Sequence, residues 1–292
     1  MNHPASVIPR KLHALALALL LAGCAIGGSN GSATASAPDP APIMTAPPLI
    51  TLPNGFVLST TTAAPPGPRP NPGLVPAIQR GSDAKHASFV ALAQKGGIDL
   101  LFLGDSITDF WRTPGRGKEV WDQYYGNLQA ANFGINADRT QNVLWRLQNG
   151  EGQGFAPKAV VLMIGTNNIG VTTRRTPASP WRGTSAEAVE GVTAVVAELR
   201  KDFPNAKILL LGIFPRGDDL LAMQQIPEVN RGLAKLDDQQ HVFYLDLGPK
   251  FLGPDGQINP ALFQTSDRLH PTAAGYVVWA EGIKDTLAKL LR

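Results

Sequence analysis

The sequence predicts an α/β domain in which helices cover both faces of a parallel sheet. Five short apolar segments of strand length alternate with amphipathic helical segments from about residue 81 to the carboxyl terminus. The strand segments are almost continuously apolar, which is typical of strands buried on both faces. Polar residues follow the segments, and in a parallel sheet such positions meet at one edge. The three observations therefore agree on a fold class and on the edge where a ligand would bind.

The predicted strands are runs rich in Val, Ile, Leu and Phe that are too short to be independent helices. They cover residues 98–103, 129–134, 158–164, 207–213 and 242–247. The first run ends abruptly at Gly104, and the polar residues Asp105 and Ser106 follow it. This change predicts a strand, a tight turn and the first turn of a helix.

The predicted helices carry apolar residues three and four positions apart, with capping or helix-ending residues at their ends. They cover residues 82–96, 119–126, 140–147, 185–203, 227–238 and 272–291. In the longest clean one, Thr184 or Ser185 is the expected cap, and Pro204 lies just beyond the end.

Residues 1–23 have the pattern of a bacterial secretory signal. Two basic residues precede an apolar run at 14–22, which has the length of a signal peptide rather than of a membrane span. Small residues stand directly before Cys24, the single cysteine of the chain, and this arrangement resembles the lipobox of a bacterial lipoprotein. The resemblance implies cleavage before Cys24 and lipidation of its thiol and new amino group, with Ala25 favouring the outer membrane. The alternative is an ordinary secretory signal with an incidental cysteine.

Residues 24–80 are rich in Pro, Gly, Ser, Thr and Ala and bury too little apolar surface to offset the entropy of ordering them. We expect them to form a semi-stiff tether, and residues 81–292 to form one folded domain. The expected location is therefore extracytoplasmic, with the domain held at a bacterial membrane by an N-terminal lipid anchor.

The composition excludes several classes of function. The formal net charge is only +3 at pH 7 and no basic run is present, which argues against a nucleic-acid partner. A single cysteine excludes an intramolecular disulfide framework and a cysteine-rich zinc site. No pair of histidines and no cluster of histidine and carboxylate has the spacing of metal ligands, so no metal is expected.

Polar side chains gather at the carboxyl ends of the predicted strands, in strand order. They are Ser106, residues 136–139, residues 166–168, residues 216–219 and, after a loop, residues 265–270. One pocket at this edge could collect all of them.

Ser106 is the candidate nucleophile. At the end of a strand and the start of a helix its hydroxyl would be held out of the core, and nearby backbone N–H groups would favour negative charge. An acyl-transfer nucleophile needs this setting because an oxyanion develops beside it. The alternative is a common helix N-cap serine.

Asp267 and His270 stand just before the last predicted helix. Three positions apart in one turn, the carboxylate could hold one imidazole nitrogen while the other faces the pocket. The histidine could then take the serine proton and later protonate the leaving alcohol. The alternatives are a helix-capping aspartate and a solvated histidine. His86 and His241 lie away from the predicted edge, which leaves His270 as the only well-placed base.

An acyl transferase also needs hydrogen-bond donors for the developing oxyanion. Asn167 could supply a side-chain N–H from the end of the third strand, although a turn asparagine is an equal alternative when this residue is taken alone. Backbone N–H groups at Ser106 and in residues 136–138 could complete the oxyanion hole.

Together these residues resemble the GDSL/SGNH hydrolase superfamily, and within it the branch of platelet-activating-factor acetylhydrolase catalytic-subunit-like enzymes. Residues 104–107 (GDSI) are similar to the first block, residues 132–147 (NFGINADRTQNVLWRL) to the second and residues 165–168 (GTNN) to the third. Asp267 and His270 match the last block. The resemblance runs from about residue 86 to the carboxyl terminus, in the family's order.

The resemblance implies a flavodoxin-like three-layer α/β/α sandwich with strand order 2-1-3-4-5 and no cofactor. It implies that Ser106 is the nucleophile, His270 the general base and acid, and Asp267 its orienting partner. The oxyanion donors would be the Ser106 N–H, the Asn167 side chain and the backbone N–H at Ala137, where the family usually has glycine. Alanine supplies this N–H without strain if φ is negative; a required positive φ would distort the hole.

The expected function is hydrolysis of short acyl esters, acetyl esters above all, through an acyl-serine intermediate. Arg174, Arg175, Trp181 and Arg182 follow the third strand and could contact a carbohydrate or a phosphate at the pocket rim. An extracytoplasmic tethered domain favours an acetylated carbohydrate over a phospholipid of the platelet-activating-factor type. The alternative from another class is a non-catalytic surface lipoprotein that binds glycans.

Overall fold

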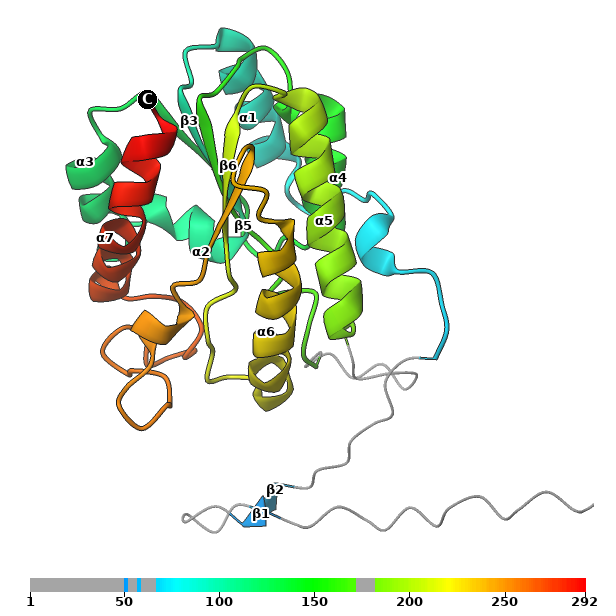
Figure 1. Ribbon diagram of the computed structural model, residues 1–292, viewed down its shortest axis with the longest axis vertical. Helices are drawn as coiled ribbons and strands as arrows, with labels where there is room; N and C mark the ends of the chain where they lie inside the picture. Colours follow the sequence, from blue (N-terminus) through cyan, green and yellow to red (C-terminus); the bar gives the residue numbers. More distant parts are fainter. Residues whose placement is uncertain (1–49, 52–56, 59–66, 172–181) are drawn as a thin grey trace, which may run out of the picture. The chain divides into compact units, whose positions relative to one another are not determined.

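The five apolar segments form one parallel sheet in the computed structural model, which describes residues 50–51, 57–58, 67–171 and 182–292. Its strands are β3 (Leu100–Gly104), β4 (Ala130–Gly134), β5 (Ala159–Met163), β6 (Lys207–Leu211) and β7 (Val242–Leu245). They lie side by side in the order β4-β3-β5-β6-β7 (Figure 1). This is the order 2-1-3-4-5, so the predicted fold class and strand order are confirmed.

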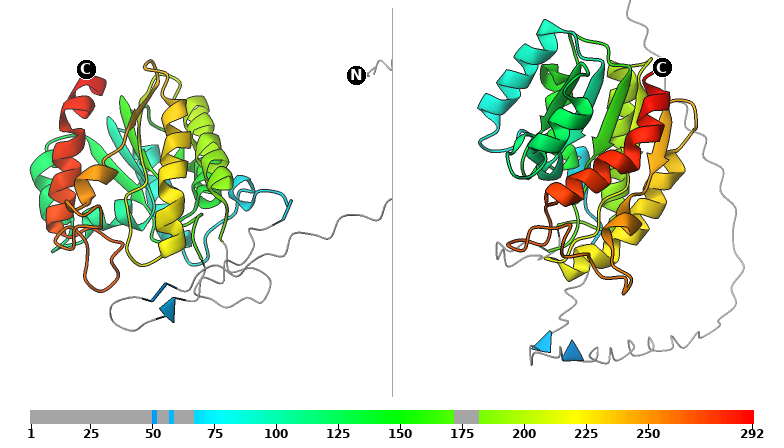
Figure 2. Two further views of the ribbon diagram at one scale, coloured as in Figure 1. Left: turned by 60° about the horizontal axis from the view of Figure 1, so that its bottom comes forward. Right: turned by 90° about the vertical axis from the view of Figure 1, so that its left-hand side faces the viewer.

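Helices lie on both faces of this sheet (Figure 2). They are α1 (Asp83–Lys95), α2 (Ser106–Asp109), α3 (Lys118–Tyr125), α4 (Thr140–Arg146), α5 (Ser185–Asp202), α6 (Leu220–Leu233) and α7 (Ala273–Leu290). Side chains of α1, α4, α5 and α6 share one hydrophobic cluster with the sheet, and those of α2, α3 and α7 share the other.

Strand β3, an interior strand of the sheet, contributes side chains to both clusters. Leu101 and Leu103 belong to the cluster under α1 and α5, whereas Leu100 and Phe102 belong to the cluster under α3 and α7. All four are fully buried. Successive side chains of a strand point to opposite faces, so a continuous apolar run is what a strand covered on both sides requires.

The predicted start of one helix was wrong. Helix α6 begins at Leu220 and passes through Pro227, rather than beginning there. The side chain of Asp219 caps it by accepting a hydrogen bond from the Ala222 N–H at 3.0 Å. Pro227 lacks an N–H and is exposed, so water can reach the carbonyl group left without a helical partner.

Part of the predicted tether lies against the domain. The 3-10 turn η1 (Pro72–Leu74) packs on α4 and α5. The Asn71 side chain donates to the Glu187 carbonyl at 2.9 Å, and the Thr140 hydroxyl donates to the Gly73 carbonyl at 3.0 Å. Contacts with the domain therefore begin before residue 81, although the composition of this segment resembles that of a linker.

The strands β1 (Ile50–Thr51) and β2 (Val57–Leu58) form a separate antiparallel pair. Among the described residues, none of the helices has the length and hydrophobicity that crossing a bilayer requires.

The N-terminus of α5 provides a test of the local structure. Thr184 accepts a hydrogen bond from the Glu187 N–H at 3.1 Å, and Glu187 accepts one from the Thr184 N–H at 2.8 Å. Thr184→Ala removes half of this capping box and should lower the free energy of unfolding by about 1 kcal/mol in urea titrations. Thr193→Ala, on the exposed middle of α5, is the matched control and should have no destabilising effect, because alanine is the better helix former. Equal losses in both variants would contradict the assigned cap.

Candidate active site

Ser106 is the first residue of α2, directly after β3 and a single linking residue. The turn is tight because β3 ends in glycine: a Cβ at Gly104 would lie 2.3 Å from the Met163 carbonyl oxygen. Asp105 caps α2 by accepting a hydrogen bond from the Ile107 N–H at 3.0 Å. Ser106 is only 3% exposed, so its hydroxyl is held at the end of the sheet under neighbouring side chains.

His270 lies next to this hydroxyl. Its Nε2 atom is 2.9 Å from the Ser106 Oγ atom, and its Nδ1 atom is 2.8 Å from Asp267 Oδ2. The Phe110 ring packs on the imidazole with 4.8 Å between ring centroids. The Tyr276 hydroxyl donates to the Ile107 carbonyl at 2.7 Å, which ties α7 to α2 and keeps the two parts of the site together.

Asp267 is itself held in place. Its Oδ1 atom accepts the backbone N–H groups of Leu269 and His270, each at 3.0 Å, across a turn in which Arg268 has a φ of 50°. Burial raises the pKa of Asp267, but these two bonds and the bond with the His270 ring outweigh burial and lower it overall. The carboxylate is therefore ionised at neutral pH and favours a proton on Nδ1, which leaves the Nε2 lone pair for the serine hydroxyl.

Ala137 has a φ of 64°, in the left-handed region. It lies in the 136–138 loop between β4 and α4, and its N–H donates to no other described residue. A non-glycine residue in this conformation costs on the order of 1 kcal/mol. Ala137 thus adopts a positive φ, which glycine would adopt without strain and which is strained for alanine.

Asn167 lies in the turn that follows β5. Its side-chain amide donates to the Asp138 carbonyl at 3.0 Å, so one of its two N–H groups is used and the other donates to no described residue. This bond brings the turn after β5 against the 136–138 loop. The backbone N–H of Ala137 and the amide of Asn167, both predicted as oxyanion donors, therefore come from adjoining segments.

Other predicted residues do not all enter the site. Arg174, Arg175 and Trp181 lie outside the described residues, as does Cys24. Arg182 is half-buried, and burial together with the nearby guanidinium groups of Arg216 and Arg139 lowers its pKa. His86 and His241 pair with Glu151 and Asp238 instead of with Ser106.

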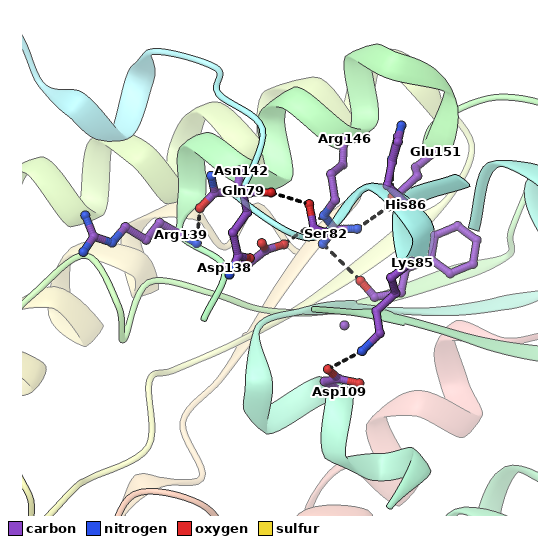
Figure 3. Close-up of polar contacts among 12 residues, drawn as sticks. Gln79, Ser82, Lys85, His86, Asp109, Asp138, Arg139, Asn142, Arg146 and Glu151 are labelled. Atoms are coloured by element: carbon purple, nitrogen blue, oxygen red, sulfur yellow. Dashed lines mark hydrogen bonds and ion pairs between the residues drawn. The ribbon is translucent and has the colours of Figure 1, made fainter. Parts of the chain in front are cut away.

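A buried charge network beside the site was not predicted from the sequence. Arg146 is 1% exposed and contacts the carboxylates of Asp138 (2.8 Å) and Glu151, and Glu151 in turn accepts from His86 at 2.7 Å (Figure 3). Its signal in the sequence is an arginine between Leu144 and Leu147, on the inward side of a short helix.

Among the described residues, no group of three or more His, Cys, Asp or Glu side chains is arranged to hold a metal ion.

Comparison with known proteins gives a consistent result. The sequence matches the GDSL-like lipase/acylhydrolase family over residues 102–278. It is 32% identical over 229 residues to the Homo sapiens platelet-activating factor acetylhydrolase IB subunit alpha2, covering 76% of this chain and 92% of that protein. It is also 32% identical over 210 residues to the Homo sapiens subunit alpha1, covering 70% and 82%.

Two solved structures share the fold. A protein from Bacteroides fragilis aligns with a TM-score of 0.57 and 19% identity, covering 74% of this chain and all (100%) of that one. A GDSL-like lipase from Bacteroides thetaiotaomicron aligns with a TM-score of 0.55 and 19% identity, covering 72% and 98%.

The pKa of Asp105 generates a test. Burial raises it from its ordinary value of 3.8 to about 7, against the lowering effect of the Ile107 N–H bond. The folded protein therefore holds an extra proton between about pH 4 and pH 7 and loses stability as pH rises through this range. Asparagine does not titrate, so the stability of Asp105→Asn should not fall over this range. Measured by urea unfolding, its free energy of unfolding should therefore rise by about 1–2 kcal/mol relative to that of the wild type as the pH increases from 5 to 7.

Asp238→Asn is the control with the opposite sign. Hydrogen bonds from the Val242, His241 and Gln240 N–H groups lower the pKa of Asp238 to about 2. Its stabilising contribution is present at neutral pH and is lost as pH falls toward 2, so this variant should be less stable at pH 7 and match the wild type at low pH. A pH-independent difference for Asp105→Asn would contradict the assignment.

Proposed function

The chain belongs to the GDSL-like lipase/acylhydrolase family and is an ester hydrolase, and we propose that it cleaves short-chain acyl esters, acetyl esters above all, through an acyl-Ser106 intermediate. The observation that carries this proposal is the pair of successive contacts from Asp267 to His270 and from His270 to Ser106, with distances of 2.8 Å and 2.9 Å. These are hydrogen-bond distances between an orienter, a base and a nucleophile.

In the proposed reaction, His270 Nε2 takes the Ser106 proton as Oγ attacks the ester carbonyl carbon. The tetrahedral intermediate collapses and expels the alcohol, which leaves with the proton held by His270. A water molecule then gives its proton to Nε2 and attacks the acyl carbon, and the second intermediate releases the carboxylic acid and restores the serine. Asp267 stays ionised throughout and stabilises the imidazolium.

The oxyanion of each intermediate would be held by the backbone N–H groups of Ser106 and Ala137 and by the Asn167 amide. Donors fixed before the reaction stabilise the transition state without having to reorganise. The partner of one Asn167 N–H is the Asp138 carbonyl at 3.0 Å, which supports a fixed side chain.

We propose an acetyl group because Ser106 is 3% exposed, His270 lies against its hydroxyl and Phe110 packs on the imidazole, which leaves little room for a long acyl chain. An acetylated carbohydrate is the proposed substrate class. In support, the described residues after β4 and β6 include Asn136, Arg139 and Asp218, which can hydrogen bond to a hydroxyl-rich leaving group.

A platelet-activating-factor type phospholipid is the second candidate. The observation that favours it is the 32% identity to subunits named platelet-activating factor acetylhydrolase, over most of their length.

We further propose that residues 1–23 direct export, that Cys24 is lipidated, and that residues after it link the domain to a bacterial membrane. Two features of the sequence support this: the apolar run of signal-peptide length and the position of the single cysteine. An outer-membrane location is the form of this proposal that Ala25 favours.

Ser106→Ala tests the reaction. It should lower kcat/KM for p-nitrophenyl acetate by about a thousandfold or more, because nucleophile and base act as a unit. Ser88→Ala, on the exposed face of α1, is the control and should keep the wild-type rate. The same panel includes an acetylated oligosaccharide, p-nitrophenyl butyrate, platelet-activating factor and a lysophospholipid. An unaltered rate in Ser106→Ala would overturn the proposed chemistry; activity confined to the phospholipids would overturn the carbohydrate assignment.

Cys24→Ala tests the anchor. In a bacterial host fed with an alkyne-tagged palmitate, the wild type should be labelled and sediment with membranes, because a diacylglyceryl cysteine adds large apolar area. The variant should lose the label and the membrane association, whereas Ser36→Ala should keep both. An unlabelled wild-type protein would contradict lipidation.

A further inference from the structure

The 136–138 loop holds an unfavourable backbone conformation that its own side chains do not explain. Ala137 has a φ of 64°, and its methyl group is exposed, so no packing of this side chain holds the conformation in place. Such conformations persist only where surrounding contacts over-determine them. The conformation is therefore held by hydrogen bonds to the flanking residues Asn136 and Asp138.

The peptide group that carries the Ala137 N–H also contains the Asn136 carbonyl. Because a trans peptide is planar, the direction of its carbonyl oxygen fixes the opposite direction of its N–H. The Asn136 carbonyl accepts a hydrogen bond from the Gln79 side-chain amide at 2.8 Å. Gln79 thus fixes the orientation of the Ala137 N–H. This is the one backbone N–H of the loop that donates to none of the described residues.

Gln79 is held by its own surroundings. Its backbone carbonyl accepts hydrogen bonds from the Ser82 hydroxyl at 2.8 Å and from the Ser82 N–H at 3.2 Å, just before α1. Two residues earlier, the Ala77 carbonyl accepts the Asn142 amide at 2.8 Å, and the Ala77 N–H donates to the Gln141 carbonyl at 3.2 Å. The side chain therefore reaches the loop from a segment that is fixed on both sides.

Two further contacts complete the support. On one side, the Asn136 N–H donates at 3.0 Å to Asp109, the last residue of α2, which also accepts from Lys85 at 2.7 Å. On the other side, Arg146 holds the Asp138 carboxylate at 2.8 Å inside the buried network (Figure 3). The loop is thereby fixed to the helix that bears Ser106 and to α4.

We propose that Gln79, outside the sequence blocks of the family, is a positioning residue for the oxyanion hole. It holds the Asn136–Ala137 peptide so that the Ala137 N–H faces the reacting carbonyl group while Ala137 remains at positive φ. This inference rests on the proposed serine hydrolase function. The segment that carries Gln79 would therefore affect catalysis, although its composition is that of a linker.

Gln79→Met removes the donor and keeps the length of the side chain. On the full chain with p-nitrophenyl acetate, kcat should fall about tenfold while KM stays within about twofold, since the N–H acts on the transition state and not on ground-state binding. Gln148→Met is the matched control: its amide donates to Glu198 at 3.3 Å on an exposed surface, and its kcat should equal that of the wild type.

Ala137→Gly distinguishes positioning from a general loss of structure. Glycine adopts positive φ without strain, so the loop should need less external support. In the Ala137→Gly background, Gln79→Met should therefore cost less than about threefold in kcat. Thermal melts show that each variant is folded. An unchanged kcat in Gln79→Met, or an equal loss in both backgrounds, would overturn the proposal; in contrast, a wild-type rate that survives Ser106→Ala would overturn the function itself.

Discussion

Ser106 lies next to the other residues of the site because three neighbouring parallel strands, β3, β4 and β5, end at the same height in the sheet. β3 lies between β4 and β5, with Gly104 paired to both Gly134 and Met163. Because all strands run the same way, the chain leaves each of them at the same edge. A Cβ at Gly134 would lie 2.3 Å from the Asp109 backbone nitrogen, so α2 sits directly on the end of β4. Short turns are then enough to bring three segments together.

Electrostatics shape the same edge. Asp105 is 1% exposed and Asp138 is fully buried, and burial raises the pKa of Asp105 to about 7 and that of Asp138 to about 6. Arg146 lowers the pKa of Asp138, but not enough to offset burial. Removing one partner from such a buried network leaves a charge without compensation, which costs far more than the pair contributes. The network therefore fixes the geometry of the loop more than it adds to stability.

The sheet was predictable because each strand is a short run of apolar residues, and a parallel sheet covered by helices on both faces buries such runs. Ser106, Asp267 and His270 could be named because a strand-to-helix turn and an Asp–His spacing are local signals. Helix α6 was misplaced because a helix interior tolerates Pro227 where the proline faces solvent, and the sequence alone does not show that exposure. The sequence did not predict the sign of φ at Ala137, because alanine gives no local signal for a positive φ. It predicted only that a positive φ would be strained there. The role of the 71–79 segment was missed because proline-rich composition predicts a linker, whereas its hydrogen bonds are made to residues distant in sequence.

The segment that carries Asn71 and Gln79 also decides how this protein should be shortened for laboratory work. A truncated chain that starts at residue 81, where the linker-like composition ends, would retain every strand of the sheet and the whole family match. It would nevertheless lose the amide that touches the Asn136 carbonyl and the turn that covers Thr140. Kinetic work on the isolated domain therefore calls for a start before Arg69, the first of the described residues to pair with α5, which it does through Glu187.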